Sequence, residues 1–123
     1  MFINFTNHPC TNWSAKQIAE AKTYGEIIDM PFPQVDPHGD EDYILKLALD
    51  CVDKIIKFKP EAVLCQGEMT LAFAVTTLLT TEYGITVLAA CSERTAEIEV
   101  GLDGESIKSA VFRFVRFRKY KPS

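Results

Sequence analysis

Hydrophobic positions along the chain follow two patterns, short apolar runs and longer stretches with apolar residues every three or four positions. The runs are typical of buried strands and the stretches of amphipathic helices. The runs lie at residues 2–6, 26–30, 62–65 and 85–91, and the stretches at 15–24, 44–56 and 68–82. The order β-α-β-α-β-α-β predicts an α/β fold whose first four strands are parallel with right-handed crossovers.

Capping and turn residues support these boundaries. Ser14 followed by Gln17 fits a capping box at the start of the first helix, and Gly25 suits its C-terminal end. Pro60 follows the second helix, and Gly84 follows the third. The stretch at 37–40 is rich in helix breakers and acid, which indicates a loop.

The C-terminal part of the chain predicts an antiparallel hairpin. Residues 98–102 and 109–117 flank Asp103-Gly104, a turn signal. Apolar residues fall on both faces of the run at 111–118, which favours a core on one side and a second subunit on the other. A terminal helix is the alternative, and the Phe and Val content disfavours it. We therefore expect one domain of 123 residues that forms a homodimer.

Composition and charge narrow the class of protein. Hydrophobic residues make up 47% and charged residues 24%, as in ordinary globular proteins, and no run approaches the roughly 20 apolar residues of a membrane span. The N-terminus lacks a signal-peptide pattern, so we expect a cytoplasmic protein with no membrane partner. The net charge of −4 argues against binding long nucleic acids.

Basic residues gather at the C-terminal end. Five of them lie between Arg113 and Lys121 with no acid among them, which leaves −9 on the rest of the chain. This pattern fits an anionic ligand at that end. It fits equally a charged final strand that discourages edge-to-edge pairing.

The four cysteines do not form a recognisable metal or redox motif. Cys10, Cys65 and Cys91 come from different strand ends and no C-x-x-C pair occurs, so a zinc site is not favoured and reduced thiols are expected. No G-x-G-x-x-G or Walker A sequence occurs either, which disfavours dinucleotides and nucleoside triphosphates. We expect neither a metal nor a cofactor.

Polar residues follow three of the predicted parallel strands. Thr6-Asn7-His8 follows the first, Gln66-Gly67-Glu68 the third, and Ser92-Glu93-Arg94-Thr95 the fourth. The carboxyl ends of parallel strands share one edge of the sheet, where open α/β sheets bind ligands. The amide and hydroxyl groups suit a base or ribose edge, and Arg94 suits a phosphate. Gly67 would let a ligand approach the backbone.

Two of these residues have proton-transfer chemistry. An unperturbed histidine titrates at about 6.5, so His8 is a candidate general acid or base. Its other interpretation is a surface histidine beside Pro9. Glu68 is a candidate base, or simply an acid favoured by the positive end of the helix that follows it.

Three segments carry a resemblance to a known family. Phe5-Thr6-Asn7-His8-Pro9, Leu64-Cys65-Gln66-Gly67-Glu68 and the Phe-Arg-Tyr run at 111–120 resemble small accessory proteins of type III CRISPR systems. These are minimal relatives of the CARF (CRISPR-associated Rossmann fold) domains. The resemblance implies a Rossmann-like fold and a homodimer that binds a cyclic oligoadenylate above the carboxyl ends of the strands.

The resemblance also implies a chemistry and residue roles. Ring nucleases among these relatives cleave the messenger without metal, through attack of a ribose 2′-hydroxyl on the neighbouring phosphate, whereas other relatives bind it without cutting. Carried over, Gln66, Gly67 and Thr70 form the ligand floor, and Thr6, Asn7 and His8 line one side. Ser92, Arg94 and Thr95 hold phosphate or ribose, and Glu68 receives adenine amino protons or serves as the base.

The sequence leaves three main functions in competition, with a hydrolase that uses the cysteines as a distant fourth. The first is a ring nuclease that cleaves cyclic oligoadenylate, probed first as cyclic tetra-adenylate, with His8 and Glu68 as catalytic residues. The second is a non-catalytic binder of the same messenger. The third is an unrelated α/β module of a larger complex.

Overall fold

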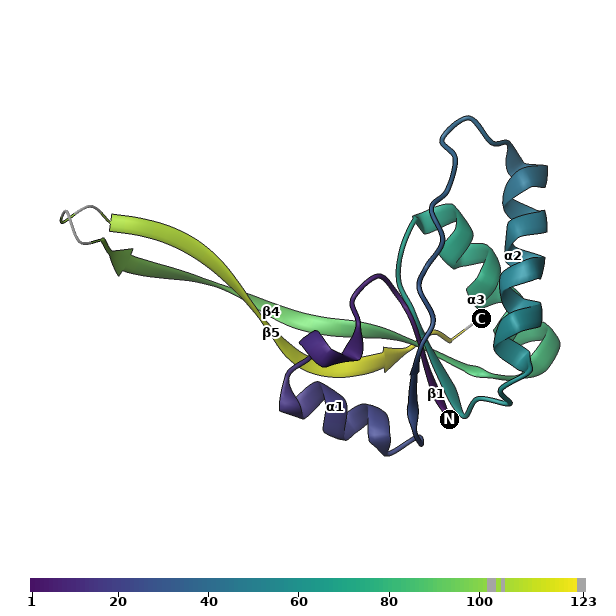
Figure 1. The fold of residues 1–123 in the computed structure, drawn as a ribbon, viewed down its shortest axis with the longest axis horizontal. Coiled ribbons are helices and arrows are strands. Elements are labelled where there is room, and N and C mark those ends of the chain that lie inside the picture. The colour runs from purple at the N-terminus through teal and green to yellow at the C-terminus, as the bar shows by residue number, and fades with distance from the viewer. Residues whose placement is uncertain (102–103, 105, 122–123) are drawn as a thin grey trace.

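A single five-stranded sheet forms the centre of the protein, with helices on both of its faces (Figure 1). The computed structural model describes residues 1–101, 104 and 106–121, and their side chains except those of 96–100 and 106–110. The elements, in chain order, are β1 (Phe2–Phe5), the 3-10 turn η1 (Cys10–Asn12), α1 (Ala15–Lys22), β2 (Ile27–Asp29), α2 (Glu41–Ile56), β3 (Ala62–Cys65), α3 (Met69–Tyr83), β4 (Thr86–Val100) and β5 (Ser106–Lys119).

The strand order is β2-β1-β3-β4-β5, with four parallel strands and an antiparallel β4–β5 pair. This confirms the predicted α/β class, the mostly parallel sheet and the C-terminal antiparallel pair. The order differs from the 3-2-1-4-5-6 arrangement of the Rossmann dinucleotide-binding fold. The topology therefore confirms the general α/β class, and the Rossmann-like (CARF-like) assignment stays a prediction.

The core has two layers, one on each face of the sheet. Helices α2 and α3 cover one face, where Val52, Ile55, Leu71 and Val75 pack on residues of β1 and β3. Helix α1 lies against the other face. The cluster on that side consists of Phe2, Ala21, Ala62, Leu64, Leu88 and Phe117. All four residues of β1 and of β3 are buried, which explains their uniformly apolar pattern apart from Asn4.

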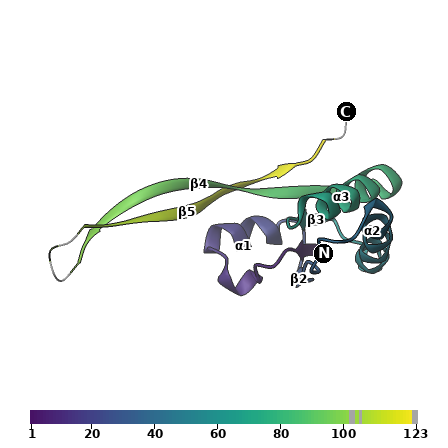
Figure 2. The same cartoon turned by 90° about the horizontal axis from the view of Figure 1, so that it is seen from above.

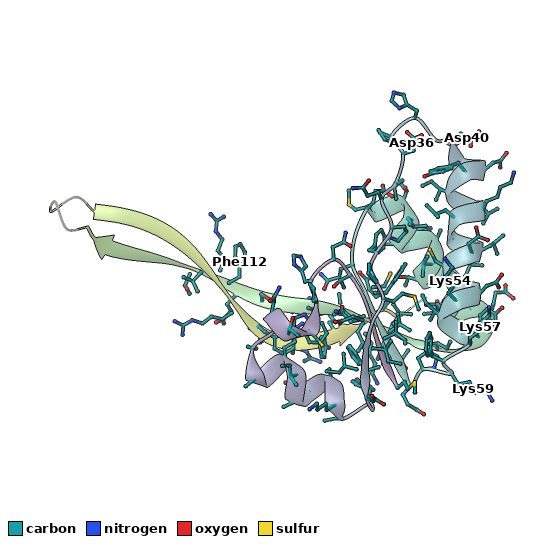
Figure 3. All side chains as sticks on the ribbon, in the orientation of Figure 1. Asp36, Asp40, Lys54, Lys57, Lys59 and Phe112 are labelled. Atoms are coloured by element: carbon teal, nitrogen blue, oxygen red, sulfur yellow. The ribbon has the colours of Figure 1, made fainter. Side chains whose placement is uncertain are left out.

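The helices begin and end close to the predicted positions. Ser14 Oγ accepts a hydrogen bond from Gln17 N (3.2 Å), as the capping-box pattern predicts, although α1 ends at Lys22, two residues before the expected Tyr24. Asp40 caps α2, whose last turn carries Lys54, so both charges complement the helix dipole (Figure 3). Within the described residues, no helix is both long and apolar enough to cross a membrane.

Strands β4 and β5 form a long ribbon that projects beyond the sheet, away from the helices (Figures 1 and 2). The sequence predicted a strand at 85–91 and a separate one at 98–102. The predicted break between these two strands was wrong, because β4 runs without interruption through residues 92–97. On a two-stranded ribbon both faces reach solvent, so polar residues there do not end a strand. Leu102, the last residue of the strand predicted at 98–102, and Asp103 of the predicted turn lie outside the described residues. Gly104 of that turn has a φ of 82°.

Candidate functional site

The carboxyl ends of β1 and β3 lie at the switch point of the sheet, where the strand connections pass from one face to the other. The β1–β2 connection carries α1 on one face of the sheet, and the β2–β3 connection carries α2 on the other. Phe5 and Cys65 are register partners, and Gln66 N donates to Phe5 O (3.3 Å). Such a switch point leaves a crevice outside the strand ends. The ends of β1 and β3 therefore lie side by side, as the parallel arrangement predicts, and Gln66 lies next to the end of β1.

A groove of about 490 Å³ opens at this point on the α1 face of the sheet. It brings together four of the predicted site residues, namely Thr6, His8, Gln66 and Ser92. The first helical turns of α1 and the near part of the ribbon form its walls. Its polar and aromatic lining comes from five segments of the chain, so only the folded state creates it.

His8 lies on a short loop, and hydrogen bonds fix its backbone N–H and C=O groups. Its N–H donates to Thr6 Oγ1 (3.1 Å), and its carbonyl accepts from Asn4 Nδ2 (2.8 Å) and Trp13 Nε1 (3.1 Å). The residue itself is exposed at the groove. The imidazole is therefore presented to a ligand from a fixed backbone.

Gln66 links β3 to the neighbouring strand. Its Oε1 accepts a hydrogen bond from Ala90 N (3.2 Å), so the side chain lies along the end of the β3–β4 pair. This contact fixes which end of the amide is the oxygen and leaves the NH₂ group as the donor of that side chain. Gln66 lines the groove on the α1 face and also a second groove on the α3 face.

Gly67 makes its close contact with Phe32 of the same chain. A Cβ at position 67 would meet the Phe32 ring at less than 3.0 Å, and Phe32 is 4% exposed. Gly67 lines the groove on the α3 face, not the one that contains His8. The absence of a side chain at position 67 therefore serves packing in this structure.

Glu68 is the N-cap of α3. Its carboxylate accepts hydrogen bonds from Thr70 Oγ1 (2.6 Å), Thr70 N (3.0 Å) and Leu71 N (2.9 Å). The Thr70 hydroxyl first, and then the two backbone N–H groups, lower the pKa of Glu68. A carboxylate held in its ionised form in this way is a weak proton acceptor. Thr70, the predicted hydroxyl donor, is committed to Glu68.

The fourth-strand residues do not lie at a strand end. Ser92 faces the groove, but Arg94 and Thr95 continue along the ribbon. Arg94 lies over the ring of Phe112 (5.9 Å), and Thr95 Oγ1 makes a long contact with Val111 O (3.5 Å). The expectation that Ser92–Thr95 ends the fourth strand was wrong. Asn7 is exposed on the loop before His8.

Comparison with known proteins identifies the family. The sequence model of the Uncharacterized protein MJ1673 family matches residues 1–118. The chain belongs to the MJ1673 family. No curated protein and no solved structure matches the chain significantly.

In this MJ1673 family member, sequence reasoning missed part of the groove lining. Trp13 follows η1, Ser14 and Gln17 come from the start of α1, and Phe112 and Phe114 come from β5. Phe112 is 67% exposed and projects from the ribbon (Figure 3). The signal for the phenylalanines was the Phe-Arg-Phe spacing, which places both on one side of a strand. Nothing in the sequence showed that this side faces α1.

Three cysteines of this family member lie in apolar or hydrogen-bonded positions: Cys51 and Cys65 are in the core, and Cys10 contacts Asp29. Burial raises the pKa of Cys65 to about 11, so its thiol stays protonated at neutral pH. Burial, and then the nearby Asp29, raise the pKa of Cys10. Within the described part of the chain, no three His, Cys, Asp or Glu side chains gather as metal ligands would.

Proposed function

We propose that this protein binds a cyclic oligoadenylate, tested first as cyclic tetra-adenylate, and cleaves it as a metal-independent ring nuclease. In this role it would switch off type III CRISPR antiviral signalling in the cytoplasm. One observation carries the proposal: His8, Gln66 and Ser92 line one groove at the switch point of the sheet, beside the exposed ring of Phe112. The resemblance to CARF relatives supplies the candidate ligand.

The groove offers the groups that a short nucleotide ring requires. Bases stack on aromatic rings, and Phe112 presents a largely exposed face. The Gln66 amide and the Ser92 hydroxyl supply hydrogen bonds for base or ribose edges. Arg94 does not line the groove, but it lies over the Phe112 ring next to it and would supply a cation for a phosphate there.

The cleavage step needs one group that takes and returns a proton. The 2′-oxygen of a ribose attacks the adjacent phosphorus as His8 accepts the hydroxyl proton. A bond forms between this oxygen and phosphorus, and the bond from phosphorus to the 5′-oxygen of the next nucleotide breaks. The protonated His8 then gives its proton to the departing 5′-oxygen, which leaves a linear product with a 2′,3′-cyclic phosphate. We assign this role to His8, because the Glu68 carboxylate is committed to the start of α3.

The α3 face supports the proposed homodimer. Met69 is 83% exposed, Phe73 is 74% exposed and Tyr120 is 46% exposed, and they line a groove of about 500 Å³ with threonines of α3. Exposed large apolar side chains gathered on one face are typical of an interaction surface. We propose that a second copy of the chain covers this face.

A non-catalytic binder of the same ring is the alternative function. The capping role of Glu68 favours it, since this leaves His8 as the single candidate proton acceptor that we identify in the groove. Such a protein would sequester the messenger and need no proton transfer.

The test is incubation of the purified protein with radiolabelled cyclic tetra-adenylate in EDTA. We expect a linear product that ends in a cyclic phosphate. A ring that binds tightly but survives excess protein for hours would select the binder. A ring that is neither bound nor cut at high micromolar protein would reject both functions.

A further inference from the structure

A buried polar network lies under the loop that carries His8. Its centre is Asn4, which is 1% exposed in the middle of the otherwise apolar β1. Burial of an amide costs free energy unless its hydrogen bonds are made. Asn4 makes three: Nδ2 donates to His8 O (2.8 Å) and Asp29 Oδ1 (2.8 Å), and Oδ1 accepts from Thr6 Oγ1 (2.8 Å).

Asp29 fixes the orientation of the Asn4 amide. An ionised carboxylate only accepts hydrogen bonds, so the NH₂ end of Asn4 must point toward it. The second N–H of the same group then points at the His8 carbonyl. Asp29 also accepts a hydrogen bond from Cys10 N (3.1 Å). One carboxylate therefore binds both the Asn4 side chain and the backbone of Cys10, at the end of the loop that follows His8.

The network acts on the backbone of His8 and leaves its side chain free. The N–H of His8 is hydrogen-bonded to Thr6, which directly follows β1, and the C=O of His8 is hydrogen-bonded to Asn4 of β1. The imidazole is exposed at the groove. A general base must hold its position closely, since a displacement of about 1 Å can lower a rate by about 100-fold.

We propose that Asn4 is a positioning residue of the site: with Asp29 as its anchor, it holds the His8 carbonyl and so sets where the imidazole stands in the groove. This inference rests on the proposed function for its effect on cleavage. Its effect on the loop does not depend on that function.

Two variants separate positioning from simple stabilisation. Asn4→Asp places a second carboxylate beside Asp29 and removes both donors, so we expect a lower melting temperature and little cleavage. The double variant, Asn4→Asp with Asp29→Asn, restores one hydrogen bond between the two side chains. The donor is then the amide at position 29 and the acceptor is the carboxylate at position 4. We expect this double variant to regain thermal stability but to cleave about 100-fold more slowly than the wild type, with a dissociation constant for the ring within a few-fold.

A measurement on the loop makes the test independent of activity. The backbone order parameter of His8, from ¹⁵N relaxation, should be about 0.85 in the wild type and fall below about 0.6 in the double variant. Trp13→Phe, which removes the indole N–H donor to the His8 carbonyl and leaves the longer contact from Thr6 Oγ1 (3.4 Å), should give an intermediate value.

The outcomes distinguish the two levels of the proposal. A double variant that regains both stability and the wild-type rate, or that keeps a rigid His8, would overturn the role of Asn4. A wild-type protein that cleaves no ring, but whose His8 loosens as expected in the double variant, would reject the nuclease and leave the positioning role standing.

Discussion

The ring of Phe32 rests on the backbone of Gly67, on the turn that follows β3. A Cβ at position 67 would approach Phe32 Cγ and Cδ1 to less than 3.0 Å. Phe32 is also packed against Phe5, with ring centroids 4.9 Å apart, so it has little room to move. The turn beside the groove is therefore locked to the core by an aromatic side chain from the loop between β2 and α2.

Gly67→Ala should destabilise the protein because it overpacks this contact. Overpacking of a buried site costs about 1–3 kcal/mol, measurable as a lower urea midpoint. In a Phe32→Ala background the added methyl has space, so the same change should cost little. Equal costs in both backgrounds would show that Phe32 is not the reason for the glycine.

The fold could be predicted where the signal was local. The capping residues Ser14 and Gly84 mark helix ends, and apolar runs mark β1 and β3, because both depend on neighbouring residues. The contact between Phe32 and Gly67 could not be predicted, since it joins a loop to a turn 35 positions away in the chain.

The candidate site could be predicted only in part for the same reason. Thr6, His8 and Gln66 were placed together correctly, because parallel strands bring their ends to one edge. Ser92–Thr95 was misplaced, since polar residues end a strand inside a domain but not on a solvent-exposed ribbon. Asn4 was overlooked as one polar residue within an apolar run.

Glu68 should make the stability of the protein depend on pH. Its pKa is lowered in the folded state from an ordinary value of 4.5, so the stabilisation is present above that pH and is lost as the pH falls through the lower folded value. Glu68→Gln lacks the charge. The melting temperature of the wild type should therefore exceed that of Glu68→Gln at pH 7, and the difference should shrink toward pH 3.

Glu82 provides the control for that comparison, because it is an exposed acid in the last turn of the same helix. Glu82→Gln should not lower the melting temperature at pH 7, since an acid near a helix C-terminus is unfavourable. The capping role would be contradicted if the two substitutions had the same effect across this pH range.

Phe112→Ala should weaken binding of cyclic tetra-adenylate. Stacking of one base on an aromatic ring contributes about 1–3 kcal/mol, which corresponds to roughly 5- to 150-fold in the dissociation constant. Phe58→Ala is a matched control, because Phe58 is 41% exposed but follows α2 away from the groove. Titration of labelled ring should separate the two variants, and equal affinities would remove Phe112 from the site.

Phe73→Glu should convert the proposed dimer into a monomer, because it places a charge in the centre of the exposed α3 face. Leu45→Glu, at a 49% exposed position on α2, should leave the dimer intact. Sedimentation velocity of both variants and the wild type gives the answer. A wild type that stays monomeric with and without ligand would contradict the proposed assembly.

The most direct test of the proposed function compares the two histidines of the chain under single-turnover conditions. Wild type, His8→Ala and His38→Ala are each mixed in excess with labelled cyclic tetra-adenylate in EDTA, and the linear product is followed over time. His38 lies 93% exposed on the loop before α2, so its removal should leave the rate unchanged. We expect His8→Ala to cleave about 10²- to 10⁴-fold more slowly. Cleavage by His8→Ala at the wild-type rate, or an intact ring after hours with the wild type, would contradict the proposed ring-nuclease function.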